Sequence, residues 1–384
     1  MIESVRLHQV RSWIDGTVAL TPGTHIFWGE NGAGKTTILE ACIIAATGRS
    51  HRTGALREVI TSDESQASIA VTVRDDDADP TDTLARSTLG VEILRAGRAK
   101  HLLNGTPRTS SALGQRLRVA AFVPEETGLV VSAPSVRRGL LDRVASQWKR
   151  GYEAALTRYE RALRQRNRLL KDALEVDGAA RRAIASEMRP WTEMLITTGS
   201  EVVAGRLALL AALAPVLSAT HNEVAPSEAN LTTHYLSREE YRADESASEC
   251  ATRLAQSFDQ TAEAEGYQGY TLVGPHRDDI AFHVGGSDIA PTASRGQQRS
   301  LLLALLFAEI TLLTDEHGQP PVLLLDDAFS ELDPQRREHL VARIAALPQS
   351  IITATALEDL APGLVARATT REIQRGPHGS AVAA

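Results

Sequence analysis

The sequence predicts an α/β fold with a mixed sheet that is interrupted by a largely helical insertion. Near the start, the β-branched and aromatic segment Thr24–Trp28 leads into a glycine-rich turn and then into an apolar helical segment. Between about residues 135 and 260, apolar side chains recur at spacings of three and four, which is typical of helices. Short apolar runs typical of buried strands return near residues 322 and 351. We therefore expect one α/β head that a helical arm splits in sequence.

The head is expected to have its first part in residues 1–130 and its second part in residues 266–384, with the arm at 131–265. In its opening stretch, Ile2–Leu20, apolar and polar residues alternate, which predicts two strands around a turn at Arg11–Asp15. The other expected elements are a strand at Thr24–Trp28, a helix at Lys35–Thr47, antiparallel strands at Ile69–Val73 and Val91–Leu94, an acidic loop at Asp75–Thr83, a helix at Ser300–Thr314, and strands at Val322–Leu325 and Ile351–Ile352.

In the arm, Trp148–Leu174 carries apolar residues on one face and predicts a long amphipathic helix. A second apolar stripe follows between Val202 and Leu213, and Ala225–Thr233 is typical of a break with a short extended piece. The simplest interpretation of both stripes is a helical core that packs on itself.

The composition is that of an ordinary globular protein, with 43% hydrophobic and 23% charged residues among 384. It excludes a disordered chain, and two cysteines exclude a disulfide framework. The longest fully apolar run, Leu301–Ala308, is far shorter than the roughly 20 residues of a membrane span, so we expect a cytoplasmic protein without a membrane partner. The net charge of −7 lowers the expectation of a broad nucleic-acid-binding face without excluding a local basic patch.

The strongest chemical signal is the run from Gly29 to Thr36, which fits the phosphate-loop pattern G-x-x-x-x-G-K-[ST] between a strand and a helix. Glycines let backbone N–H groups face phosphate oxygens, and the following helix presents its positive end to the same anion. Lys35 would reach the β- and γ-phosphates, and the Thr36 hydroxyl would bind Mg²⁺. The sequence therefore predicts a nucleotide site formed by Gly29, Glu30, Asn31, Gly32, Ala33, Gly34, Lys35, Thr36 and Thr37.

A buried strand that ends in Asp326 and Asp327 supports this site. Asp326 would hold the metal with Thr36, and Asp327 would orient the attacking water, with Lys35 as the second catalytic residue.

A second anion-binding helix end is predicted at residues 294–299, where Ser294, Gly296 and Gln297 precede a long apolar helix. One nucleotide does not need two phosphate-binding loops in one chain. The economical explanation is a homodimer that forms with ATP, in which this helix end covers the γ-phosphate held by the partner's phosphate loop.

The order of these motifs is that of ABC-type ATPase heads, and the sequence resembles the RecF family of bacterial recombination mediators over nearly its whole length. The resemblance rests on GENGAGKTTILEA (29–41), GRSHRT (48–53), VPEETGLVVSAPSVRRGLLD (123–142), ALRQRNRLLK (162–171), TLVGPHRDD (271–279), SRGQQRS (294–300) and LLLDDAFSELD (323–333).

The resemblance implies an ABC-type head with an inserted helical arm, and ATP-driven dimerisation around duplex or junction DNA that slow hydrolysis reverses. It implies DNA repair and replication as the setting, with RecR and RecO as protein partners. It also implies that Arg11 meets the nucleotide, that Ser294 and Gly296 contact the partner's γ-phosphate, and that Asp333 lies where two copies meet.

Two positions depart from the pattern of ABC heads. No glutamine that would link the lobes precedes Val123, and no histidine follows the last core strand, where Thr353 or Thr355 could replace it. With only 4% aromatic residues, base stacking is not expected, so DNA would be held by its backbone. The candidate cations are Arg49, Arg52, Arg57, Arg137 and Arg138.

Three other functions remain open from the sequence. They are an ABC-type ATPase that acts on a non-DNA partner, such as a transporter, a small-molecule kinase, and a protein that binds ATP without turnover.

Overall fold

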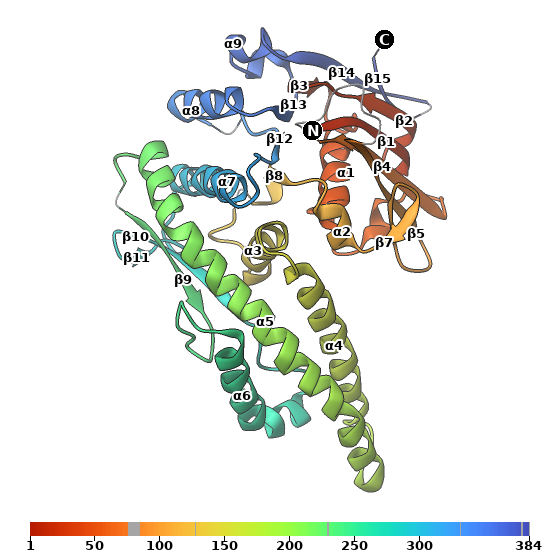
Figure 1. The fold of residues 1–384 in the computed structure, drawn as a ribbon, viewed down its shortest axis with the longest axis vertical. Helices are drawn as coiled ribbons and strands as arrows, with labels where there is room; N and C mark the ends of the chain where they lie inside the picture. The colour runs from red at the N-terminus through yellow and green to blue at the C-terminus, as the bar shows by residue number, and fades with distance from the viewer. Residues whose placement is uncertain (76–84, 127, 229, 331, 378, 384) are drawn as a thin grey trace. The chain divides into compact units, whose positions relative to one another are not determined.

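The computed structural model describes the whole chain except residues 76–84, 127, 229, 331, 378 and 384. The described residues form two compact units, and most of their helices and strands are labelled in Figure 1. The head unit comprises Met1–Gly128, Glu223–Ala225 and Ser294–Ala384, and the arm unit comprises Leu129–Asn222 and Pro226–Ala293.

The arm unit begins close to the predicted residue 131 but ends at Ala293, later than the predicted 265. The physical reason is pairing inside the arm. Strand β10 (Asp279–Val284) pairs antiparallel with β9 (Leu231–Leu236), and Thr271 accepts a hydrogen bond from Arg166 of an arm helix. Residues 266–293 therefore pack with the arm and not with the second part of the head.

The head unit has two six-stranded sheets, as the mixed α/β prediction requires. The first is parallel except for its edge strand and has the order β15 (Gly379–Val382), β14 (Thr369–Gly376), β3 (Gly23–Trp28), β13 (Gln349–Ala354), β12 (Val322–Asp326) and β8 (Val119–Phe122). The second is antiparallel and has the order β2 (Trp13–Ala19), β1 (Ile2–Val10), β4 (Gln66–Arg74), β5 (Arg86–Leu94), β6 (Lys100–Leu103) and β7 (Thr106–Arg108). The predicted hairpin and meander are confirmed, and the predicted acidic loop after Asp75 lies outside the described residues.

Helix α1 (Lys35–Thr47) has the predicted bounds and contacts both sheets. It is apolar on all sides, with side chains such as Ile38, Leu39 and Ile44 fully buried, and such a helix is stable only inside a core. Because α1 is held on both sides, the phosphate loop that precedes it has a rigid support.

Helix α7 (Arg295–His317) begins five residues before the predicted Ser300. The reason is local: the Ser294 hydroxyl accepts a hydrogen bond from Gln297 N, and the Gln297 side chain accepts one from Ser294 N. This reciprocal capping box starts the helix at residue 295. The remaining head helices are α2 (Ser110–Gly114), α8 (Pro334–Ala345), α9 (Pro362–Val365), η1 (Leu56–Val59), η3 (Pro124–Glu126) and η4 (Leu357–Asp359).

The arm unit contains α3 (Pro134–Trp148), α4 (Tyr152–Asp172), α5 (Gly178–Val224, whose last residues belong to the head unit), α6 (Ala247–Gln268) and a sheet of β9, β10 and β11 (Ser287–Asp288). Helices α4 and α5 lie side by side (Figure 1). Their contact is close, since a Cβ added to Gly199 or Gly205 of α5 would meet the ring of Tyr159 or Tyr152 of α4. The predicted helical arm with a short extended piece is confirmed.

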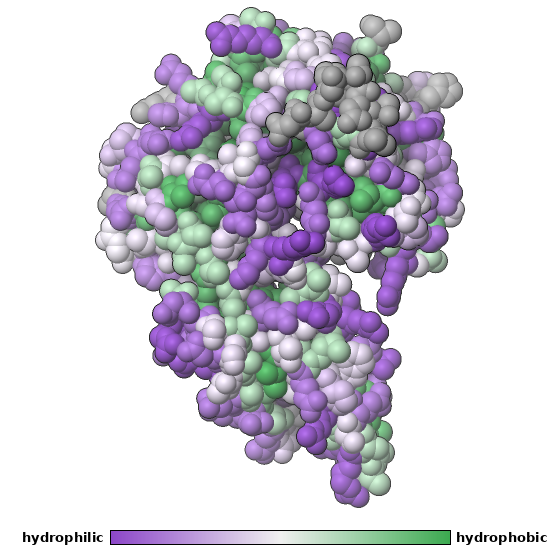
Figure 2. Space-filling model, in the orientation of Figure 1, coloured by the Kyte–Doolittle hydropathy of each residue, from purple (hydrophilic) through white to green (hydrophobic). Residues whose placement is uncertain are grey.

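Helix α5 is long and apolar enough to cross a membrane by length and composition alone. Half of the most apolar 18-residue stretch of α5 is buried inside the protein. Among the described residues of α5, Met194 is the one large hydrophobic side chain that is exposed. Figure 2 shows hydrophilic residues over much of the visible face of the arm unit. These features fit a core helix of the arm.

Candidate functional site

The phosphate loop between β3 and α1 needs glycine for reasons of space as well as conformation. Gly34 has a φ of +105°, and a Cβ there would lie 2.5 Å from the Ser380 hydroxyl and 2.8 Å from Trp13 Nε1. Gly29 has a φ of +140°, and its Cβ would collide with the carbonyl oxygen of Ile373. The loop is therefore wedged between β14, β15 and the β1–β2 turn, which fixes its backbone for binding an anion.

Lys35 lies across the loop that it follows. Its ammonium donates hydrogen bonds to the carbonyl oxygens of Gly29, at 2.5 Å, and Glu30, at 2.9 Å. Burial lowers the pKa of Lys35, and the carboxylates of Asp327 and Asp326 oppose that shift. The cation is thus held inside the concave loop, where phosphate oxygens would meet it.

Asp326, at the end of β12, joins three elements of the site. Its Oδ1 accepts hydrogen bonds from the Thr36 hydroxyl of α1 at 3.0 Å and from the Thr353 hydroxyl of β13 at 2.6 Å. The Thr353 oxygen also accepts a hydrogen bond from Asp327 N at 3.0 Å. Thr353 is therefore a link between the two acidic residues. Thr353 and Thr355 both line the pocket.

Asp327 has the left-handed backbone conformation, with a φ of +48°, which is uncommon for a residue with a side chain. Burial raises the pKa of its carboxyl group, and the nearby Asp326 acts in the same direction. The combination of an unusual backbone and a carboxyl whose basicity is increased is typical of catalytic positions.

These residues line a pocket of about 510 Å³ in the head unit. Among the sequence-predicted site residues, the structure brings together there Arg11, Asn31, Gly32, Gly34, Lys35, Thr36, Thr37, Asp326 and Asp327. Gly29, Glu30 and Ala33 belong to the same loop, whereas Ser294, Gly296 and Gln297 do not line this pocket.

A buried carboxylate that the sequence analysis missed holds Arg11. The Arg11 guanidinium donates two hydrogen bonds to Glu40, from Nε at 3.1 Å and Nη2 at 2.8 Å. Ser50 Oγ and Arg52 Nη1 donate to the same carboxylate at 2.6 and 3.3 Å. Glu40 is fully buried, so this pairing fixes the direction in which Arg11 and Arg52 enter the pocket.

Other pocket residues gave no recognisable sequence signal. They come from four separate segments and are Ser12, Glu58, Ile60, Thr61, Ser62, Pro124 and Arg375. Only the fold brings them together, because the residues between them in sequence form sheets and helices elsewhere. No motif spacing could have found them.

The start of α7 lies on the surface. Ser294 is exposed, and its hydroxyl caps its own helix. A Cβ added to Gly296 would meet only Ser294 Oγ at 3.7 Å and Arg336 Nη2 at 4.0 Å, both ordinary contacts. Packing among the described residues therefore does not require glycine at position 296.

The candidate DNA-contacting arginines fall into two groups. Arg137 is 9% exposed and donates two hydrogen bonds of 2.7 Å to Asp279, and Arg138 donates to the carbonyl oxygen of Asp278 at 2.8 Å. Both side chains are held within the arm unit, and Arg137 is too buried to reach a DNA phosphate, whereas Arg138 is only half-buried. In the other group, Arg49, Arg52 and Arg57 are exposed, although Arg52 also pairs with Glu40.

The phosphate loop precedes a helix that packs between the two sheets of the head unit, and a strand that ends in two carboxylates lies beside it. This arrangement defines an ATPase head of the ABC type. The model of the RecF/RecN/SMC N terminal domain matches residues 1–363. The chain belongs to the RecF family: it is 35% identical to the DNA replication and repair protein RecF of Symbiobacterium thermophilum over 94% of this chain and 92% of that protein. It is 33% identical to RecF of Ligilactobacillus salivarius, with 98% and 96% covered.

Solved structures support the same fold. The structure of the recombination mediator protein RecF-ATPrS in the RecFOR pathway has a TM-score of 0.84 at 24% identity, with 100% of this chain and 98% of that chain covered. The RecF-ATP structure has a TM-score of 0.79 at 26% identity, with 94% of each covered. An Smc head domain from Pyrococcus furiosus has a TM-score of 0.53 at 17% identity, covering 100% of this chain and 95% of that chain.

Proposed function

We propose that this chain is an ATP-dependent DNA-binding protein of gap repair and replication restart. Two copies dimerise when ATP binds and hold duplex DNA or a junction of single- and double-stranded DNA. Slow, DNA-stimulated hydrolysis then releases the DNA. By family resemblance, RecR and RecO are its partners, and the cytoplasm is its location.

The observation that carries the proposal is the separation between the pocket and the start of α7. The described lining of the pocket includes none of residues 294–297, so a nucleotide held by Lys35 would be left open on the side of its γ-phosphate. Ser294 lies exposed at the positive end of a helix, beside a glycine that its own surroundings do not require. A second copy would supply this helix end, and the absence of a side chain at Gly296 would let its backbone approach the phosphate.

The side chains of the site suit ATP with Mg²⁺. The Thr36 hydroxyl and the Asp326 carboxylate are oxygen ligands, which Mg²⁺ prefers, and their hydrogen bond shows that they converge on one point. When bound, Mg²⁺ would neutralise charge on the phosphates. Lys35 binds the phosphate oxygens, and Asp327 accepts the proton of the attacking water at its carboxylate.

DNA binding would rest on the phosphate backbone. The exposed cations Arg49 and Arg57 lie after α1 in the head unit. Because the chain carries a net charge of −7, only such local patches can attract DNA, and binding should weaken steeply as salt increases.

The experiment is the mass of the full chain in solution, measured by light scattering with and without ATP and Mg²⁺, and then with a gapped duplex. We expect the mass to double with ATP in the wild type and in the control variant Ser287→Arg, which places the same charge on an exposed strand of the arm unit. Lys35→Met and Ser294→Arg should remain monomeric.

DNA retention should follow the dimer, with Lys35→Met losing the ATP-dependent part. If Ser294→Arg dimerises as the wild type does, the proposed sandwich of two copies is wrong. If the wild type dimerises but binds the gapped duplex equally with and without ATP, the clamp is wrong while the dimer stands.

A further inference from the structure

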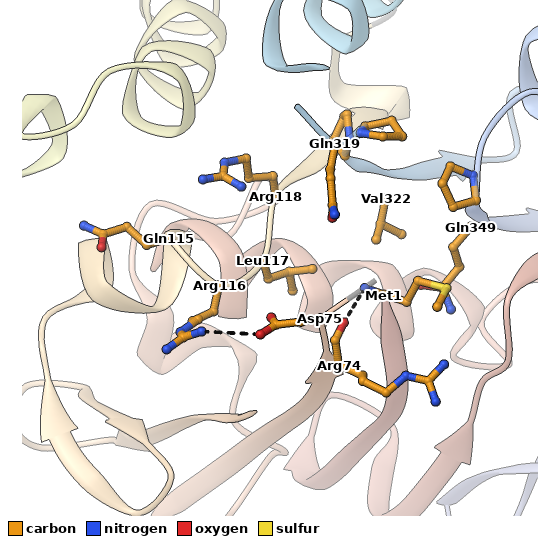
Figure 3. Close-up of a pocket in the computed structure, with 13 residues that line it drawn as sticks. Met1, Arg74, Asp75, Gln115, Arg116, Leu117, Arg118, Gln319, Val322 and Gln349 are labelled. Carbon is orange, nitrogen blue, oxygen red and sulfur yellow. Dashed lines mark hydrogen bonds and ion pairs between the residues drawn. The ribbon is translucent and has the colours of Figure 1, made fainter. Parts of the chain in front are cut away.

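The head unit has a second, smaller pocket that the proposed function does not use (Figure 3). It has a volume of about 140 Å³ and lies where β8, β12 and β13 begin, next to the backbone hydrogen bond from Val322 N to the carbonyl oxygen of Arg118. The nucleotide pocket lies at the opposite, carboxyl ends of β3 and β12. An occupant of the second pocket would therefore not displace ATP.

The pocket is strongly basic. Arg74, Arg116 and Arg118 line it, together with one carboxylate, Asp75. Arg116 lies 3.9 Å from Asp75, a solvent-exposed pair of small energetic value, and Arg74 lies 3.6 Å from Glu3. The side chain of Arg118 has no hydrogen bond or ion pair with any of the described residues.

The side chain of Arg118 is half-buried, so part of its guanidinium is removed from water. Its Nε is buried and has no hydrogen-bond partner among the described residues, and burial lowers the pKa of the group. A desolvated charge without a partner costs free energy. The same group gains a strong charge-assisted hydrogen bond as soon as an anion enters the pocket. The site is thus built to bind an anion.

The apolar residues that line the pocket indicate which kind of molecule would carry the anion. Leu117, Val322 and three prolines, Pro320, Pro321 and Pro348, surround the basic groups. A duplex spreads its phosphates over a surface of roughly 600 Å² or more for even a single binding module, which does not fit a recess of this size. A carboxylate on an aliphatic side chain fits both the arginines and the apolar residues of the pocket. Its two oxygens match the paired N–H donors of an arginine, and its methylene groups would contact the apolar lining.

We propose that this basic pocket binds the carboxylate of an acidic segment of a partner protein, with Arg118 as its main contact. The binding does not depend on ATP, on the dimer or on the proposed function.

The test measures binding of the full chain to a fluorescein-labelled octapeptide, Gly-Glu-Leu-Glu-Gly-Glu-Leu-Glu, by fluorescence anisotropy at low salt. The matched probe has glutamine in place of every glutamate. Loss of charge-assisted hydrogen bonds predicts that Arg118→Gln weakens binding of the acidic peptide about tenfold or more. Arg98→Gln, an exposed arginine of the head unit outside the pocket, should bind as the wild type does.

Thermal unfolding separates recognition from a structural role. Because the Arg118 side chain has no described partner, Arg118→Gln should leave the unfolding temperature unchanged or raise it slightly. If Arg118→Gln unfolds at a temperature low enough to explain its weaker peptide binding, the proposal is overturned. It is also overturned by equal binding of the two peptides, equal binding by Arg118→Gln, or an Arg118-dependent affinity for duplex DNA or inorganic phosphate without affinity for the peptide.

Discussion

Replacing Glu40 by glutamine tests whether a buried carboxylate organises the nucleotide pocket. Glu40 is fully buried and accepts four hydrogen bonds, two from Arg11 and one each from Ser50 and Arg52. Removing one partner of a buried ion pair costs about 3–5 kcal/mol. Here the loss is smaller, because the side chains of Arg11 and Arg52 are 27% and 35% exposed and glutamine keeps one acceptor. We expect a local destabilisation of about 2 kcal/mol.

The assay is hydrogen–deuterium exchange of the α1 amides, since an intact two-unit chain need not unfold in one step. A loss of about 2 kcal/mol predicts roughly thirtyfold faster exchange of α1 in Glu40→Gln at pH 7. The control Glu64→Gln, at an exposed position without an ion pair to another described residue, should change the free energy by less than about 0.5 kcal/mol. If α1 in Glu40→Gln exchanges as slowly as in the control, the reasoning fails.

The pH dependence of this difference has a defined sign. Burial alone would raise the pKa of Glu40, but the hydrogen bonds and charges of Arg11, Ser50 and Arg52 outweigh it and lower the pKa below 4.5. A carboxyl whose pKa is depressed in the folded state stabilises it fully above the unfolded pKa and loses that effect as pH falls through the folded value. The gap between wild type and Glu40→Gln should persist from pH 7 to about pH 5 and shrink below pH 4.5.

Three further substitutions test the chemistry of the site. Thr353→Val removes the hydroxyl that donates to Asp326 and accepts from Asp327 N. Phosphate release should therefore slow about tenfold or more, while ATP affinity changes little. An unchanged rate would contradict the role of Thr353 as a link between the two acidic residues. Because burial raises the pKa of Asp327, the rate of ATP hydrolysis should begin to fall with acid at a pH above 3.8, the pKa of an ordinary aspartate. Asp327→Asn should abolish hydrolysis but keep the ATP-dependent dimer. Rapid turnover by this variant would exclude Asp327 as the base. Gly34→Ala should weaken binding of a fluorescent ATP analogue at least about tenfold through backbone strain and the contact with Ser380. Gly105→Ala, which also has a positive φ but nothing within 4 Å of the added Cβ, should not weaken it; equal affinities of Gly34→Ala and the wild type would show that the loop is not rigid.

The sequence predicted the parts of the site that are local in the chain. The strand, loop and helix around Gly29–Thr36 follow from residues that are neighbours in sequence, and the predicted bounds of the helix at Lys35–Thr47 are those of α1. Asp326 and Asp327 were recognisable because a buried strand has an apolar sequence and their carboxylates end it. The start of α7 was predicted five residues too late, at Ser300, although Ser294 and Gln297 have the spacing of a capping box.

The rest depends on contacts between distant residues. Glu40 looks like one polar residue on an apolar helix, and only the fold reveals that Arg11 and Arg52 reach it from opposite directions in sequence. Arg118 is likewise unremarkable in sequence, because what distinguishes it is the absence of a described partner for its side chain. Pairing and burial of this kind are properties of the packed chain and have no spacing that a motif could capture.

The run 274–279 is one of the segments on which the resemblance to the RecF family rests, but its side chains have a structural role. In this structure His276 is hydrogen-bonded to the Tyr159 hydroxyl at 2.5 Å, and Asp279 forms the ion pair with Arg137. Asp278 accepts from Tyr235 at 2.6 Å, and burial raises its pKa to about 7. All of these partners belong to the arm unit. The run therefore stabilises the core of the arm unit, while the groups that would meet ATP come from the head unit.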